Sequence, residues 1–367
     1  MIARAHRFGL AVLAGALVAS TPGLAAAGWV PVGQGTIEEI LPTLAPGQLL
    51  VVEVSADWCA PCWQLKTEVL DTALGDALVE SDRGLMVDFE SPYGQEVKKL
   101  YGVLGLPTTF VLDREGLEIG RVEGYPGRRE WVEAVRDAKA GRFGLAALEA
   151  RAKKAPRDPA LQIELAQARL VRARFDRAGA AGEARALRAL DAIIARSTDP
   201  RSLDAAAHAA RVKGRWLLRV REDGPAAVAH FEAMDQRFAG TPHAASFRYW
   251  TASAHHKMGA EGRALAIFEA WAAEVPDAKE PGELQADFMV HFGYAPDRSE
   301  PVVRAALERA PGSAELHYLL ARVLRKKGDH AGATTAIARA VELEPGAAMY
   351  TNYQRRLAAG IDEAAAP

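Results

Sequence analysis

The chain has 367 residues, of which 25% are charged, and a formal net charge of −2 at pH 7. Its length implies two domains rather than one. The near-neutral charge, without a basic tract interleaved with aromatic side chains, argues against nucleic-acid binding.

The first 27 residues predict a secretory signal peptide. Arg4 and Arg7 precede an apolar run over 8–19, and small residues follow up to Ala27, after which we expect cleavage. The run is short for a membrane span, although an uncleaved membrane anchor stays open as an alternative. No later segment approaches 18 uninterrupted apolar residues, so we expect a soluble mature protein in the periplasm or another exported space.

Residues 28–143 show a pattern of expected helices and strands that is typical of an α/β domain. A turn at 113–116 would join the last two strands as a hairpin. The expected helices cover 36–44, 61–78, 95–100 and 129–140, and the expected strands cover 49–54, 85–89, 108–112 and 117–122.

The chain's only two cysteines, Cys59 and Cys62, have C-x-x-C spacing and directly follow the strand expected at 49–54. At a strand-to-helix junction, backbone N–H groups and the helix dipole favour a thiolate over a thiol. A zinc site would need further ligands from distant histidines, and a permanent disulfide closing so short a loop would constrain the unfolded chain little. The spacing therefore favours redox chemistry over these two alternatives.

Two segments give the chain a resemblance to the thioredoxin family over roughly residues 34–140. The first is 56–62, which contains the cysteine pair, and the second is 101–108, which resembles the cis-proline loop of that family. The resemblance implies a thioredoxin fold, in which helices flank a central mixed sheet. It also implies a cis bond before Pro107, whereas an ordinary trans proline that opens a strand is the alternative.

The resemblance also assigns roles around the dithiol. Cys59, nearer the helix start and expected to be the more exposed, would attack a disulfide, and Cys62 would resolve the mixed disulfide. Substrate-binding positions carried over from the family are Trp58, Pro61, Leu106 and Pro107. No cofactor beyond the redox-active pair and no metal is expected.

Glu53 stands six residues before Cys59, where thioredoxins commonly carry a buried aspartate. The resemblance implies that Glu53 is a base for Cys62, because a buried carboxylate needs a reason. An edge strand with Glu53 facing water is the alternative. Met86 replaces the lysine that often neighbours that aspartate, so the local charge balance differs. Trp63 either adds an exposed apolar surface or packs on the helices that follow.

From residue 144 to 367 the composition changes to Ala, Leu, Arg and Glu, with few strand formers. Prolines recur at intervals of 34 or 35 residues, a period typical of tetratricopeptide (TPR) repeats. Glycine closes the first helix of a repeat at Gly259 and Gly328, and proline follows the second helix at Pro276 and Pro345. We expect some five stacked units, with a degenerate turn at 293–296 and a capping helix at 349–359.

The concave side of such a solenoid usually binds a protein segment, although it could merely position or stabilise the first domain. Four histidines in this region raise a metal hypothesis, but packing or solvent exposure is the simpler interpretation. They are His255, His256, His291 and His317.

Two classes of function compete at this point. The first is an exported thiol–disulfide oxidoreductase that reduces or isomerises disulfides of client proteins, with an unidentified redox partner and with repeats that recruit a protein. Similarity around the dithiol and at 105–108 to the C-terminal periplasmic domain of DsbD-type interchange proteins favours reduction. The alternative is a TPR adaptor or chaperone in which the dithiol is a redox switch or vestigial.

Overall fold

A computed structural model describes residues 28–177 and 179–360. The signal peptide expected at residues 1–27 lies outside these described residues. The N-terminal part is built on a five-stranded sheet in the order β1-β3-β2-β4-β5, in which β4 runs antiparallel to β2 and β5. The strands are β1 (Gly28–Val30), β2 (Leu50–Ser55), β3 (Arg83–Asp88), β4 (Thr108–Leu112) and β5 (Glu118–Glu123).

Helices cover both faces of this sheet, which gives three layers. Residues of α1 (Ile37–Ile40) and α4 (Pro92–Tyr101) share one core with Leu50, Val52 and Val54. The opposite face is covered by residues of α2 (Ala60–Leu65), α3 (Ala73–Leu78) and α5 (Arg128–Lys139). The alternation of β2 therefore sends apolar side chains into both cores.

Local chemistry explains three differences from the expected elements. The helix expected over 61–78 is divided into α2, a π-helical segment η2 (Lys66–Leu70) and α3, because the Thr72 hydroxyl accepts from the Leu74 N–H and caps a new helix. The helix expected over 36–44 ends as a 3-10 turn, η1 (Leu41–Thr43). Strand β1 was not predicted, since three residues are too few to show a period.

From residue 145 on, the described part of the chain forms helices without strands and has the TPR-like arrangement that the proline spacing predicts. Gly259 and Gly328 adopt positive φ after α11 and α15, as expected for helix ends. The capping helix is also confirmed, as α17. The helices are α6 (Leu145–Lys154), α7 (Pro159–Arg172), α8 (Gly179–Ile194), η3 (Pro200–Ser202), α9 (Leu203–Arg219), α10 (Gly224–Arg237), α11 (Ala244–Lys257), α12 (Glu261–Glu274), α13 (Glu280–His291), α14 (Pro296–Arg309), α15 (Ala314–Lys326), α16 (His330–Leu343) and α17 (Ala348–Ala358).

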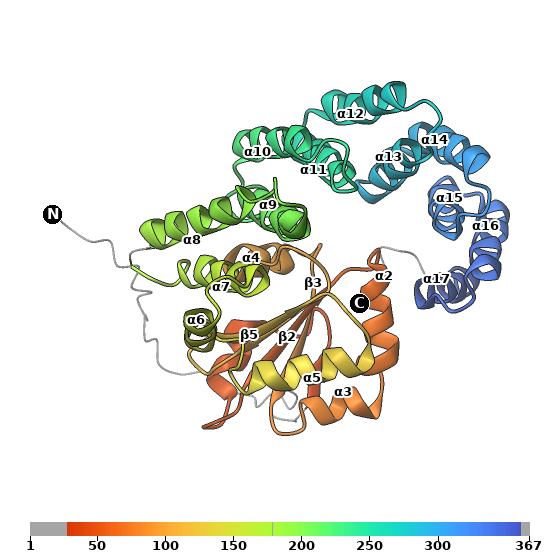
Figure 1. Cartoon of the computed structure of the whole chain (residues 1–367). Coiled ribbons are helices and arrows are strands. Elements are labelled where there is room, and N and C mark those ends of the chain that lie inside the picture. The colour runs from red at the N-terminus through yellow and green to blue at the C-terminus, as the bar shows by residue number, and fades with distance from the viewer. Residues whose placement is uncertain (1–27, 178, 361–367) are drawn as a thin grey trace, which may run out of the picture.

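Figure 1 shows these helices as an arch that leaves the sheet near α6, passes over it and returns beside α2 through α17. The arch contacts the first domain at both ends. Leu104 is buried in the core of the early repeats, and α17 contacts α2. Within the described ranges, no helix is long and apolar enough to cross a membrane.

Candidate active site

Strand β2 leads the chain into the dithiol from the centre of the sheet. It lies between β3 and β4, so Glu53 is not on an edge strand, and the residue is only 2% exposed. The chain then turns through Asp57 and Trp58, and α2 begins at Ala60 with Cys59 as its N-cap. The strand-to-helix junction expected from the sequence is therefore present.

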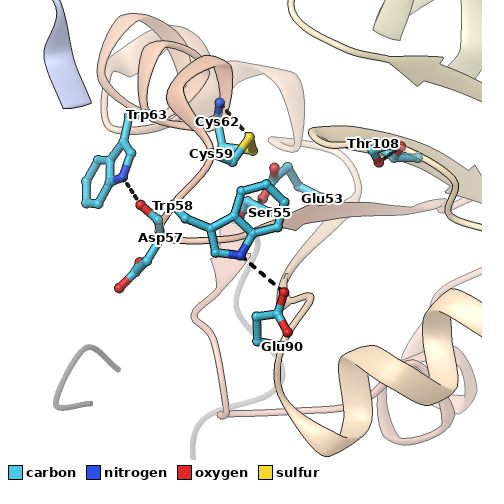
Figure 2. Close-up of a disulfide and its surroundings, with 10 residues drawn as sticks. Glu53, Ser55, Asp57, Trp58, Cys59, Cys62, Trp63, Glu90 and Thr108 are labelled. Atoms are coloured by element: carbon cyan, nitrogen blue, oxygen red, sulfur yellow. Dashed lines mark hydrogen bonds between the residues drawn. A yellow bond between two sulfur atoms is a disulfide. The ribbon is translucent and has the colours of Figure 1, made fainter. Parts of the chain in front are cut away.

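Cys59 and Cys62 form a disulfide at the start of α2. The Cys62 backbone N–H donates to Cys59 Sγ at 3.3 Å, an interaction drawn in Figure 2 that would also favour a Cys59 thiolate after reduction. The expected difference in exposure is wrong, because each cysteine is 4% exposed in the folded chain. Repeat helices cover this end of α2, but only Cys59 of the pair lines the cavity described below.

Glu53 has one satisfied and one unsatisfied carboxylate oxygen. The Ser55 hydroxyl donates to its Oε2 at 3.0 Å, whereas Oε1 is buried without a hydrogen-bond partner among the described residues. Burial raises the pKa of Glu53 to about 7, against smaller lowering effects of Ser55 and Lys66. A carboxylate with this pKa is suited to exchange a proton near neutral pH.

The neighbours of Glu53 differ from those in the family pattern, which often has a lysine on the adjacent strand. Met86 of β3 pairs with Glu53, as the resemblance implied, and Thr109 of β4 pairs with it on the other side. Lys66, one turn beyond Cys62 on η2, supplies a positive charge that acts on Glu53 instead. No sequence signal identified Lys66, because its relevance depends on how the helix lies over the sheet.

The loop before β4 has the backbone geometry that the resemblance implies. The Leu106–Pro107 bond is cis, as the resemblance implies. Pro107 is buried, while Leu106 is half-buried and lines the same cavity as Cys59. Pro61, at the start of α2, also lines this cavity.

Trp58 and Trp63 occupy the two flanks of the cysteine pair, as Figure 2 shows. Trp58 Nε1 donates to Glu90 Oε1 at 3.1 Å, and its ring meets His291 of α13 edge to face at 4.2 Å. Trp63 Nε1 donates to the Asp57 carbonyl at 2.7 Å, and its ring packs against the core of the last repeats. Of the two alternatives for Trp63, packing on the helical region is the one observed.

The last helix, α17, contacts the first domain beside the dithiol. Arg356 of α17 forms an ion pair with Asp57 at 3.0 Å, and Met349 of the same helix lines the cavity next to Cys59. Because the partly exposed ion pair contributes little by itself, the apolar packing of Trp63 is the stronger element of this contact.

A cavity of about 400 Å³ lies between the dithiol and the concave side of the repeats. This volume is within the range of small-molecule sites. Its walls come from both parts of the chain, namely Trp58, Cys59 and Leu106 from the first domain and Arg215, Trp250 and His291 from the repeats. The sequence analysis missed the repeat residues, since proximity across more than 100 positions leaves no local pattern.

The histidines considered for a metal site do not assemble into one. His291 contacts Trp58, and burial, with nearby arginines, lowers its pKa to about 4, so it is neutral at pH 7. His256 lies 3.2 Å from the Tyr294 hydroxyl and His317 lies 3.1 Å from the Pro311 carbonyl. Over the described ranges, no group of three or more His, Cys, Asp or Glu side chains is placed to hold a metal ion.

The fold and the site together define a thioredoxin-like domain that contains the Cys59–Cys62 pair and is followed by helical repeats. Residues 37–139 match the family model of a thioredoxin-like domain. The thioredoxin-like protein HCF164 of Arabidopsis thaliana chloroplasts is 32% identical over 99 residues, which cover 27% of this chain and 37% of that protein. The match therefore spans little more than a third of the relative's length.

Three solved structures resemble part of this chain at low sequence identity and low TM-score. A chain of MamA from Desulfovibrio magneticus RS-1 is 18% identical with a TM-score of 0.32, and the matched region covers 43% of this chain and 86% of the MamA chain. YrrB, described as a TPR protein with an unusual peptide-binding site, is 16% identical with a TM-score of 0.31, and covers 58% of this chain and 100% of its own. Human IFIT1 is 16% identical with a TM-score of 0.34, and covers 64% of this chain and 56% of its own.

Proposed function

We propose that the chain is an exported thiol–disulfide oxidoreductase that reduces or isomerises disulfides of client proteins. The observation that carries this proposal is the arrangement of Cys59 and Cys62 at the start of α2, beside the cis Leu106–Pro107 bond and above the buried Glu53. An inert structural disulfide would need neither a buried base nor a cavity that reaches one of its sulfur atoms.

The first step of the proposed reaction is attack by the Cys59 thiolate on a client disulfide. A bond forms between Cys59 Sγ and one client sulfur, and the other client sulfur leaves as a thiolate that takes a proton from solvent. Cys59 has this role because it lines the cavity and accepts the Cys62 N–H, which favours its ionised form.

The second step is resolution by Cys62. Glu53 accepts the Cys62 proton, and the Cys62 thiolate attacks Cys59 Sγ, so that the bond to the client breaks and the second client sulfur leaves as a thiolate. This thiolate takes a proton from solvent, and Glu53 returns its proton to solvent. The client disulfide has gained two electrons, and the chain ends as the Cys59–Cys62 disulfide seen here. A dithiol of a redox partner must then reduce this disulfide in the same way for turnover.

Substitution of the two cysteines tests this order. Cys62→Ser should accumulate mixed disulfides with clients, because the resolving thiol is gone, whereas Cys59→Ser should accumulate few. The amount of mixed disulfide is measured by non-reducing electrophoresis, followed by reduction of the trapped species. Equal trapping by both variants would contradict the assignment.

The direction of electron flow is tested by equilibrium titration of the mature protein against glutathione. A reduction potential near that of thioredoxin, about −270 mV, supports reduction, and one near that of the strong oxidant DsbA, about −120 mV, overturns it.

Export is proposed on the N-terminal residues alone. Release of an N-terminal peptide ending at Ala27 on secretion, read by mass spectrometry, would support it, and an intact N-terminus in the cytoplasm would not.

The adaptor hypothesis retains one supporting observation. The repeats cover the dithiol and α17 contacts α2, so reduction of the disulfide could alter this contact rather than process a client. Turnover distinguishes the two functions. Repeated reduction of a small disulfide by catalytic amounts of protein, with dithiothreitol as electron source, requires an enzyme, and a stoichiometric reaction that stops after one equivalent favours a switch.

A further inference from the structure

Arg215 lines the cavity between the dithiol and the repeats and carries a buried guanidinium that is not fully hydrogen-bonded within the described part of the chain. It lies on α9 and projects to the cavity wall, where its guanidinium stands 4.5 Å from the ring of Trp250. Its Nε is buried and has no hydrogen-bond partner, and no carboxylate lies within ion-pair distance of it among the described residues. The Trp250 ring offers a cation–π contact but no hydrogen-bond acceptor, so burial of this guanidinium costs free energy and its retention calls for a reason.

Of the other charged side chains that line this cavity, Arg219 and Asp287 have hydrogen-bond partners. Glu315 also lines it, and burial, with the nearby charges of Asp287, Glu283 and Glu344, raises the pKa of this carboxyl group, which favours its neutral form. Arg219, one turn further along α9, donates from Nη1 to the Leu104 carbonyl at 2.7 Å. Asp287 of α13 accepts from the Tyr249 hydroxyl at 3.0 Å, and the charge acting on it is that of Arg322 rather than Arg215. Among the described residues, Arg215 is therefore a cation of this cavity whose guanidinium has hydrogen-bonding capacity left for a ligand.

Arg215 is also close to the reactive loop. A Cβ placed on Gly105 would stand 3.6 Å from Nη1 of Arg215, in ordinary van der Waals contact. Gly105 precedes Leu106, which lines the cavity together with Cys59. An anionic group bound to this guanidinium would thus lie beside the loop that is expected to hold the substrate, next to the disulfide.

We propose that this cavity is the substrate site and that Arg215 binds a carboxylate of the substrate. The enzyme would then prefer negatively charged substrates in which the disulfide belongs to a small molecule or to an unfolded peptide segment. The inference rests on the proposed oxidoreductase function and names its substrate class. The cavity volume of about 400 Å³ suits a small disulfide or a short extended segment, not a folded surface. The planar guanidinium suits a carboxylate, which it can bind through two N–H groups.

The test uses three small disulfides of similar size and different charge as probes: dithiodipropionate (anionic), hydroxyethyl disulfide (neutral) and cystamine (cationic). The reduced full-length protein is mixed with each, and the second-order rate constant is read from the oxidation of Cys59 and Cys62. Rates are expressed relative to those of free dithiothreitol, which removes the intrinsic reactivity of each probe.

Arg215→Gln should lower the relative rate for dithiodipropionate on the order of tenfold, because a charge-assisted hydrogen bond is lost. The rate for hydroxyethyl disulfide should change by less than about twofold, as expected of a group that acts on charge alone. Arg215→Lys should restore part of the preference. Arg188→Gln, which removes the same charge from an exposed position on α8, is the matched control and should behave as the parent.

Each remaining outcome has a distinct meaning. Equal effects of Arg215→Gln on all three probes, or none, would overturn the anion site while leaving the oxidoreductase function in place. Failure of the parent protein to react with any probe would overturn both. A disulfide-linked peptide with glutamate beside each cysteine distinguishes the sources: Arg215 dependence for the peptide identifies an acidic segment, and dependence for dithiodipropionate alone identifies a small molecule. Reduction of a folded protein disulfide as fast as that of dithiodipropionate would contradict the size limit.

Discussion

Replacement of Glu53 by glutamine should stabilise the protein and slow the resolving step at the same time. Burial raises the Glu53 pKa from the ordinary value of 4.5 to about 7, so the folded protein holds more protons than the unfolded chain between these values. Stability therefore falls as pH rises through this window and is lowest once Glu53 is ionised in both states. At 1.36 kcal/mol per unit of pKa, the difference corresponds to about 3 kcal/mol.

Glu53→Gln should remove this pH dependence. At pH 8 the variant should unfold with a free energy about 3 kcal/mol higher than the parent, and near pH 4 the two should be nearly equal. Chemical denaturation of the oxidised forms at both pH values gives the two free energies. The same stabilisation at both pH values would refute the assignment of the raised pKa to Glu53.

The kinetic consequence follows from the ionised fraction. With a pKa of about 7, roughly one tenth of Glu53 is ionised at pH 6 and nine tenths at pH 8. Resolution of a mixed disulfide by the parent should accelerate across this range, and Glu53→Gln should slow it by about 100-fold, the lower end of general-base effects. Stopped-flow rates that match the parent across this range would show that Glu53 is not the base.

Three further predictions concern the cysteines and the packing of the arch. Cys62→Ser should trap mixed disulfides that Cys59→Ser does not, read on non-reducing gels, and equal trapping would contradict the order of attack. Asp57→Asn should change the free energy of unfolding by less than about 1 kcal/mol, because its ion pair with Arg356 is partly exposed; a larger loss in urea denaturation would mean that this pair, not apolar packing, holds α17. Phe268→Ala should cost about 3 to 5 kcal/mol, since the ring is fully buried between repeats, and a cost below about 1 kcal/mol would show that the repeat core is loosely packed.

The sequence predicted the local features of the site well. The strand expected at 108–112 coincides with β4, and the cysteine pair lies at the start of a helix as its position after an apolar run required. These features depend on residues close in the chain, where period-two alternation, a proline at a helix start and a helix-ending glycine act directly on the backbone. The break at Thr72 was missed because its capping hydroxyl competes with a helix that the apolar pattern alone would continue.

The burial of Glu53 shows how a sequence can leave two readings open. An acidic residue in an apolar run fits an edge strand, where it faces water, as well as a central strand, where it is buried. The strand order decides between these two positions, because β3 and β4 on either side of β2 leave no edge for the carboxylate. Strand order depends on contacts between segments about 30 to 60 residues apart, which periodicity does not report.

By itself, the sequence determined most of the elements, the position of the dithiol at a helix start and the repeat period, because short-range backbone and side-chain chemistry sets each of them. The cis bond before Pro107 was expected from the resemblance to the thioredoxin family. Only the tertiary structure decided that the concave side of the repeats covers the dithiol, that α17 returns to α2 and that Arg215 stands beside Gly105. The path of a solenoid is the sum of small rotations at each packed helix pair, so a slight change in each would carry α17 far from Trp63. Interhelical packing, rather than any one motif, therefore sets which groups can reach Cys59.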